Sequence, residues 1–318
     1  MFKNIMYKTP NLGYIKEFYT NKKIKKIVNV YQKQYTNIKG QGFGDFLRGS
    51  IFLTYICLVL NLEFDIDLKN HPLSNLLEIN EKIYNVNYSN IYAIIDYGDH
   101  TKEKSNVLSF INLLNNWNGE ICYIFINCIP RFPIENPIYG IIQPARKVII
   151  PKIEAKQYIL DILDKKLTEK GLSRKNYIVI HVRCGDYFMN IKKNIDTEKH
   201  KISSKHINDI VKILKNNCGP KKKYIIVGDS NEIKKEISSK FSNMIVFDTE
   251  ITHLGEDTRN NEKALIETLL DFNIMRFSNF IVSFTAYGHG SGFSRYCASI
   301  YNIPFRQVIL QPTLEYRV

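Results

Sequence analysis

The feature that most constrains the fold is the alternation of short apolar runs and helical segments in the second half of the sequence. Apolar runs that predict strands lie at 177–182, 224–227, 244–247, 280–284 and 307–310. Helical segments lie between them, at about 203–216, 231–241, 261–277 and 291–301. Strands that alternate with helices predict a parallel, doubly wound α/β sheet.

The first half shows the same pattern less regularly. A glycine-rich turn, 40–44, follows a short extended stretch at 35–38 and precedes a helix over about 45–61. A strand is expected at 62–68, and further extended runs lie at 91–95 and 121–126. The order strand, loop, helix, strand is the unit from which doubly wound sheets are assembled.

Five prolines, at 130, 133, 137, 144 and 151, are expected to break regular structure and to connect two α/β halves. A length of 318 residues allows two domains, which we place at 1–152 and 153–318. Two such halves predict an interdomain cleft that holds ligands at the carboxyl ends of strands.

Composition excludes several classes of protein. Hydrophobic residues at 44% and charged residues at 24% argue against a disordered chain, a collagen, a coiled coil or a membrane bundle. The net charge of +13 favours an anionic partner, but heavy use of Lys, Ile, Asn and Tyr is also typical of AT-rich coding sequences. Because the lysines at 22, 23, 25 and 26 have no Arg or aromatic residues among them, they predict an exposed helical face and no nucleic-acid partner.

The six cysteines lie far apart without a Cys-x-x-Cys pair, so we expect neither zinc nor a disulfide framework. The longest apolar run, 51–60, is too short to span a bilayer, and the amino-terminal residues lack a signal-peptide pattern. The sequence therefore predicts a cytoplasmic protein with reduced thiols and no membrane span.

The densest polar cluster is 181–187, which follows an apolar strand. Strand alternation places His181 and Arg183 on one face, before Gly185 and Asp186 at the turn. An imidazole and a guanidinium at a strand end suit a phosphate, because Arg offers a bidentate fork to its oxygens. An Arg183–Asp186 ion pair that merely fastens the turn explains the same residues equally well.

The second cluster, 283–295, lies between a strand and a helix. Its Gly-x-Gly-x-Gly spacing lets the backbone approach a ligand, and the amides of the next helix form a natural anion site. Alternatively, Ser291 or Ser294 serves as a helix cap and the glycines only make a turn.

A third glycine loop ends with Gly42, Gly44 and Asp45 at the start of a helix, without the Gly-Lys-Ser/Thr of a P-loop. Asp65 and Asp67 form an Asp-x-Asp pair on an expected strand, but no further oxygen ligands are evident nearby. We therefore expect no metal site. The scattered histidines are interpreted as surface or loop residues; they are His71, His100, His200, His206 and His253.

Together these clusters resemble the fucosyltransferases that use GDP-fucose without a metal, and they come closest to the α-1,2 form. The stretch 181–187 is similar to the family's His-x-Arg-Arg-x-Asp motif, and 224–230, which ends in Gly-Asp-Ser, is similar to a second motif that ends in Ser-Asp-Asp. The segment 264–278 resembles the family's helix with an Asp before Leu-Met, and 283–295 stands where the family has its Ser-Thr-Phe-Ser loop. Residues 42–47 resemble the family's Gly-x-Gly-Asn loop.

The resemblance implies two facing Rossmann-like domains of the GT-B type, with an amino-terminal acceptor domain and a carboxyl-terminal nucleotide-sugar domain. It implies that Arg183 binds the β-phosphate of GDP-fucose and that His181 and Asp271 contact guanine. The diphosphate loop would be Ser291, Gly292, Phe293 and Ser294. Asp229, Gly42 and Gly44 would also line the donor site.

The sequence departs from the family at Cys184, at Asp45 and in the longer loop 285–290. The expected reaction is an inverting, metal-independent transfer of fucose to a glycan hydroxyl, with Arg183 on the leaving diphosphate and Asp45 or Asp186 as base. No cofactor is expected, and the absence of an anchor suggests a bacterial or viral source. Two alternatives remain: a transferase of this fold that uses another nucleotide sugar, and a non-catalytic binder of glycan or nucleic acid.

Overall fold

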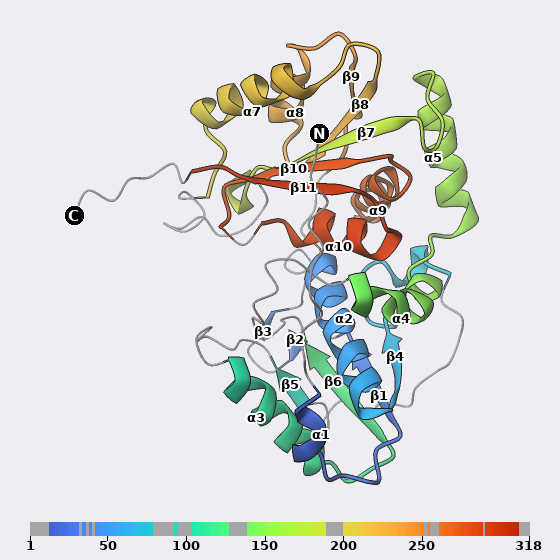
Figure 1. Cartoon of the computed structure of the whole chain (residues 1–318). Helices are drawn as coiled ribbons and strands as arrows, with labels where there is room; N and C mark the ends of the chain where they lie inside the picture. Colours follow the sequence, from blue (N-terminus) through green and yellow to red (C-terminus); the bar gives the residue numbers. More distant parts are fainter. Residues whose placement is uncertain are drawn as a thin grey trace, which may run out of the picture. The chain divides into compact units, whose positions relative to one another are not determined.

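The structure is a computed structural model of the chain, and it divides into two compact units, residues 1–154 and 155–318 (Figure 1). It describes residues 13–31, 34–35, 38–39, 42–78, 92–94, 103–126, 139–188, 200–250, 254, 261–288 and 290–311.

Unit 1, residues 1–154, is built on a four-stranded sheet in the order β4-β1-β6-β5, in which all neighbouring strands are parallel. Its strands are β1 (Lys26–Val30), β4 (Glu63–Asp67), β5 (Tyr92–Ile94) and β6 (Ile121–Ile126), and β2 (Gln34–Tyr35) with β3 (Ile38–Lys39) forms a separate antiparallel pair. Its helices are α1 (Ile15–Phe18), α2 (Phe43–Leu60), α3 (Glu103–Asn115) and α4 (Tyr139–Ile149). The unit is thus an open parallel α/β sheet, as predicted.

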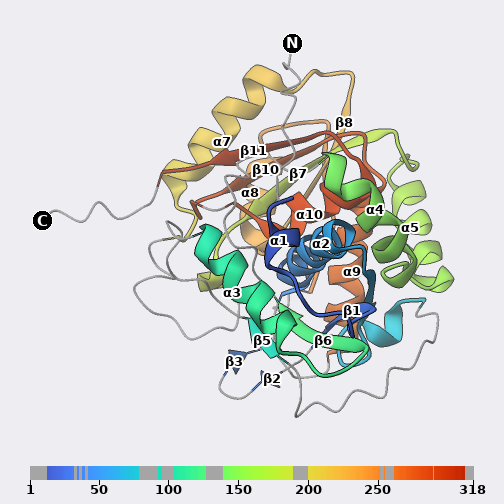
Figure 2. The same cartoon turned by 60° about the horizontal axis from the view of Figure 1, so that its bottom comes forward.

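Helix α2 forms the apolar centre of unit 1 and contacts β1, β4 and β6. Figure 2 labels α2 together with β1 and β6. Among the described helices it alone is long and apolar enough to cross a membrane, but 72% of its apolar window is buried inside the protein. Gly49 allows the close approach of α2 to β6, because a Cβ atom there would lie 2.1 Å from the carbonyl oxygen of Ile126. This is the environment of a core helix.

Three sequence-based expectations for unit 1 are wrong. The lysine run does not form a helical face, because Lys22–Lys25 lie in a loop and Lys26 begins the inner strand β1. The strand that precedes α2 in the parallel sheet is this β1, whereas the extended stretch near 35–38 contributes only to the β2–β3 pair. The stretch with five prolines contains helix α4 with Pro144 inside it, since Ala145 and Ile149 form a buried face. Pro130, Pro133 and Pro137 lie outside the described residues.

Unit 2, residues 155–318, has a five-stranded parallel sheet in the order β11-β10-β7-β8-β9. Its strands are β7 (Tyr177–Arg183), β8 (Lys223–Gly228), β9 (Met244–Val246), β10 (Ile281–Thr285) and β11 (Phe305–Ile309). Its helices are α5 (Gln157–Glu169), α7 (Ser204–Asn217), α8 (Asn231–Ser238), α9 (Glu262–Arg276) and α10 (Gly292–Tyr301). The predicted strands and four of these helices are confirmed to within a few residues, and only α5 was not predicted.

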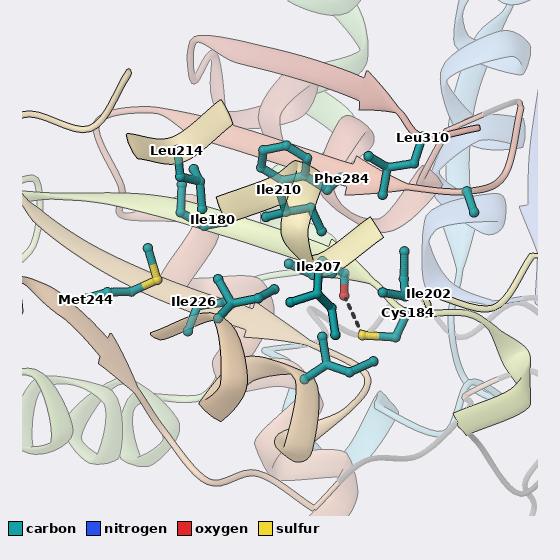
Figure 3. Close-up of a cluster of buried hydrophobic side chains, with 14 of the residues drawn as sticks. Ile180, Cys184, Ile202, Ile207, Ile210, Leu214, Ile226, Met244, Phe284 and Leu310 are labelled. Carbon is teal, nitrogen blue, oxygen red and sulfur yellow. Dashed lines mark hydrogen bonds between the residues drawn. The ribbon is translucent and has the colours of Figure 1, made fainter. Parts of the chain in front are cut away.

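The two faces of this sheet carry different helices, with α7 and α8 on one side and α9 and α10 on the other (Figure 1). Ile180, Ile226 and Phe284 point into an apolar cluster with Ile207 and Ile210 of α7 (Figure 3). Because strand residues alternate, His181 and Arg183 face the opposite side, toward α9 and α10. The sheet therefore has one fully apolar face and one that carries polar side chains.

Candidate functional site

The candidate site lies in unit 2, where the strand order changes direction. Strand β7 is the first of its sheet, and the chain proceeds from it to β8 and β9 on one side and then to β10 and β11 on the other. In open parallel α/β sheets, ligands bind beyond the carboxyl ends of the strands at such a point. The register places His181 beside Ser283 and Arg183 beside Thr285, so two of the sequence clusters meet there.

His181 is a buried, neutral imidazole. Its Nδ1 lies 3.1 Å from Oγ of Ser283, and this oxygen accepts a hydrogen bond from Ser294 of α10 at 3.0 Å. The ring of Phe293 lies 6.3 Å away, between ring centres. Burial is the main reason that the pKa of His181 is lowered to about 4. The imidazole is thus uncharged near neutral pH and offers a ring nitrogen as a hydrogen-bonding group.

Arg183 is held by two carboxylates. One terminal nitrogen donates to Oδ2 of Asp229, after β8, and the other donates to Oδ1 of Asp186. Burial opposes its charged form, but both carboxylates hold the pKa of Arg183 above its ordinary value. The Arg183–Asp186 ion pair considered from the sequence is therefore present, and Asp229 adds a second anion to it.

The loop after β10 packs closely against β11 at Gly290. Gly290 has a φ of +82°, and a Cβ atom there would lie 2.8 Å from Oε1 of Gln307. That same oxygen accepts the backbone N–H of Ser291 at 3.3 Å, while Nε2 of Gln307 donates to the carbonyl of Ser283 at 3.0 Å. Ser291 stands at the N-cap position of α10 without a side-chain capping bond, so its hydroxyl is not used for capping. His289 lies outside the described residues.

Tyr287 joins this loop to the one that follows β7. Its hydroxyl accepts a hydrogen bond from the backbone N–H of Asp186 at 3.1 Å, and its ring stacks on His200 at 4.6 Å. The guanidinium carbon of Arg183 lies 5.8 Å from the ring centre of Tyr287. Gln307 and Tyr287 were not proposed as site residues, because their roles depend on loops that meet only in the folded chain.

Asp271 lies on α9, partly buried, in a set of charged residues. Burial raises the pKa of Asp271 to about 7, while the ammonium of Lys234 lowers it, Glu267 raises it and Lys166 lowers it. Lys234 of α8 is fully buried and donates to the Phe247 carbonyl at 3.1 Å and to Thr249 Oγ1 at 2.7 Å. Asp271 therefore keeps its proton to a higher pH than a free carboxyl does, which is common for groups at functional sites.

Gly42, Gly44 and Asp45 lie in unit 1, at the start of α2. Gly42 occupies the N-cap position without a side-chain capping bond, and Gly44 is buried. Asp45 is half exposed and pairs with Arg48 at 3.2 Å between Oδ1 and Nη2. A carboxylate in the first turn also complements the helix dipole. Gly40 and Gln41 lie outside the described residues.

Asp65 and Asp67 are buried near Lys152, whose Nζ lies 3.4 Å from Oδ1 of Asp65. Within the described ranges, no three His, Cys, Asp or Glu residues gather as metal ligands would.

The expectation for the histidines is wrong at His71, which is buried against aromatic rings of unit 1, and at His206, which is buried. His206 also forms a capping box with Ser203 at the start of α7. His100 and His253 are outside the described part of the chain.

Comparisons with known proteins identify the fold. No family model matches the sequence, and no curated protein matches it. Among solved structures, the α-1,6-fucosyltransferase NodZ soaked with GDP-fucose has a TM-score of 0.52 at 14% identity, over 92% of this chain and 98% of that one. The selenomethionine form of NodZ from Bradyrhizobium also scores 0.52 at 14% identity, over 92% and 97%. NodZ co-crystallised with GDP scores 0.50 at 13% identity, over 86% and 92%.

The chain thus has the fold of these fucosyltransferases. The resemblance seen in the motifs is confirmed at the level of the fold, and the parallel α/β class is confirmed with it. At 13–14% sequence identity, this likeness is one of fold.

Proposed function

We propose that this protein is a glycosyltransferase that moves fucose from GDP-fucose to a glycan hydroxyl, with inversion and without a metal ion. One observation carries the proposal: His181 and Arg183 of β7 and the glycine loop of β10 adjoin the point where the strand order of unit 2 reverses. The shared fold of NodZ, which was solved with GDP and with GDP-fucose, supports the choice of donor.

In this proposal the donor site belongs to unit 2. Arg183 binds the β-phosphate, and the backbone and hydroxyls of Ser291, Gly292, Phe293 and Ser294 hold the diphosphate. His181 and Asp271 contact guanine. Asp229 fixes the guanidinium of Arg183, to which it is bonded.

The reaction breaks the bond between the anomeric carbon and the diphosphate oxygen, and the acceptor oxygen bonds to the opposite face of that carbon. Negative charge grows on the leaving diphosphate, and Arg183 with the first amides of α10 would stabilise it. A well-placed donor of this kind contributes about 3 kcal/mol in other enzymes. The acceptor proton passes to a carboxylate, for which Asp186 and Asp45 are the candidates.

Unit 1 would then supply the acceptor side, with Gly42, Gly44 and Asp45 at the start of α2. A cleft between the units is expected from the two α/β halves of the sequence and stays a prediction.

Calorimetric titration with GDP in EDTA tests the donor site, with UDP as the control nucleotide. We expect GDP to bind in the micromolar range and Arg183→Ala to weaken binding by about 10- to 100-fold, because it removes charge-assisted hydrogen bonds. Arg174→Ala is the matched control, since Arg174 also pairs with a carboxylate of unit 2, Asp164, but lies outside the proposed site. Absence of GDP binding with and without divalent metal would refute the proposal, and equal binding of UDP would favour another nucleotide sugar.

A further inference from the structure

The guanidinium of Arg183 carries one positive charge, and it is bonded to two carboxylates. Asp186 and Asp229 each accept a hydrogen bond from a different terminal nitrogen of Arg183. One cation between two carboxylates leaves a surplus of one negative charge. A diphosphate approaching this arrangement would meet a carboxylate on each of the two terminal nitrogens of Arg183.

Asp229 is built firmly into the fold. Its Oδ1 accepts the backbone N–H of Cys184, so both of its oxygens are bonded. It stands directly between Gly228, the last residue of β8, and Ser230, whose hydroxyl caps α8. A Cβ atom at Gly228 would lie 2.4 Å from the carbonyl oxygen of Val182, so β8 and β7 are tightly apposed here. With its side chain only 11% exposed, Asp229 has little freedom to leave Arg183.

Asp186 is more exposed than Asp229 and lies in a short turn. It opens a three-residue 3-10 turn, Asp186–Phe188, and its side chain is 29% exposed. Gly185, directly before it, has a φ of +114°, so the chain turns sharply out of β7 at this point. The Tyr287 hydroxyl accepts the backbone N–H of Asp186 and also forms a hydrogen bond with the Asp186 carboxylate. The partners of this carboxylate, Arg183 and Tyr287, are both side chains, which can move with a ligand, whereas Asp229 is also bonded to a backbone N–H.

We propose that Asp186 occupies, in the unliganded protein, the position on Arg183 that a phosphate of the donor takes, and that donor binding displaces it while Asp229 stays in place. This inference rests on the proposed function. Asp229 is then a positioning residue for Arg183, and Asp186 is an internal competitor of the donor. The exchange also frees the Asp186 carboxylate from its cation when the donor is bound, which is when the reaction needs a base.

Calorimetric binding of GDP and of inorganic pyrophosphate to a matched set of variants tests the exchange. We expect Asp186→Asn to bind both probes about tenfold more tightly, since displacing a neutral amide from Arg183 costs less than displacing a carboxylate. Asp229→Asn changes the net charge equally, but we expect it to bind more weakly because Arg183 loses its fixed partner. Asp164→Asn, which breaks the Arg174 pair of the same unit, controls for net charge and should bind as the wild type does.

The outcomes separate this inference from the proposed function. If the wild type binds GDP and Asp186→Asn binds it equally or less tightly, the exchange is wrong and the donor site stands. If neither protein binds GDP or pyrophosphate, Arg183 is no anion site and both ideas are wrong. Asp186→Ser, whose side chain is too short to span to Arg183, repeats the test should the Asn variant fold poorly, and unfolding midpoints check each protein.

Discussion

Nδ1 of His181 on β7 lies 3.1 Å from Oγ of Ser283 on β10. These two strands are parallel neighbours, and the strand order of the sheet reverses between them. Ser294 donates to the same oxygen from α10, at 3.0 Å. The hydroxyl of Ser283 thus links two strands and a helix within the proposed donor site. All three side chains are buried, so each bond is shielded from water.

We expect Ser283→Ala to destabilise unit 2 by about 1–3 kcal/mol, because it leaves buried polar partners on His181 and Ser294 unsatisfied. The free energy of unfolding from chemical denaturation measures this. Ser239→Ala is the control: its exposed hydroxyl bonds only within its own helix turn, and its removal should change stability by about 0.5 kcal/mol or less. A similar loss in both variants would contradict the linking role of Ser283.

The strands of unit 2 are predictable from the sequence because each is a compact apolar run with helix or turn signals at both ends. Strand β1 is not predictable in this way, because the lysines before Ile27 are not typical of the start of an inner strand. Helix α5 carries a recognisable signal, in that Ile159, Leu163 and Leu167 recur every four residues and are buried. This spacing is typical of an amphipathic helix.

Some residues of the candidate site are likewise predictable from the sequence and others are not. His181, Arg183 and Asp186 are apparent because a strand end followed by a polar turn is a local pattern. The contacts of Gln307 with Ser291 and of Tyr287 with Asp186 join residues 16 and 101 positions apart. Such contacts depend on strand order and loop conformation, which no local pattern contains.

Asp271 should make stability depend on pH. Burial raises the pKa of Asp271 to about 7, above the value of 3.8 for a free carboxyl. Between these values the folded protein retains a proton that the unfolded chain has lost, so this residue's contribution to stability falls as pH rises from about 4 to about 7. Unfolding at pH 5 and pH 8 should show that the stability of Asp271→Asn relative to the wild type is higher at pH 8 than at pH 5. An equal difference at both values would contradict the raised pKa.

Lys234 should control the pKa of Asp271, because its ammonium favours the ionised carboxylate. We expect Lys234→Met to raise the pKa of Asp271 further, which a titration of the carboxyl carbon by NMR can follow. Lys235→Met is the matched control: the neighbouring lysine is exposed and pairs with Asp248 at 2.9 Å. A carboxyl pKa that is unchanged in Lys234→Met would show that the two groups are not coupled.

Gly49→Ala should destabilise unit 1, because the steric cost of the added Cβ exceeds the gain in helix propensity. In an open helix position, alanine would stabilise by about 1 kcal/mol relative to glycine. Here its Cβ would lie 2.1 Å from the Ile126 carbonyl oxygen, which belongs to a strand and cannot move alone. We therefore expect a net loss of at least about 2 kcal/mol in denaturant unfolding. Gly219→Ala, where a Cβ meets nothing within 4 Å, should be close to neutral.

His71 should make unit 1 sensitive to acid. Its ring lies 4.4 Å from that of Tyr31, between ring centres, and burial lowers the pKa of His71 to about 3. Nδ1 accepts the backbone N–H of Leu73 at 3.0 Å, whereas Nε2 has no hydrogen-bond partner among the described residues. The unfolded chain binds a proton below pH 6.5 that the folded chain does not, so stability is lost as pH falls from about 6.5 toward 3.

Fluorescence of Trp117, the one tryptophan of the chain, reports unfolding of unit 1. In His71→Phe, which retains an aromatic ring in the cluster, the slope of stability between pH 4 and 6 should fall by about 1.4 kcal/mol per pH unit, the value for one proton. His71→Asn should show the same loss of slope at lower overall stability, because its side chain leaves a cavity among the aromatic rings. A slope retained in both variants would assign the acid sensitivity of unit 1 to another group.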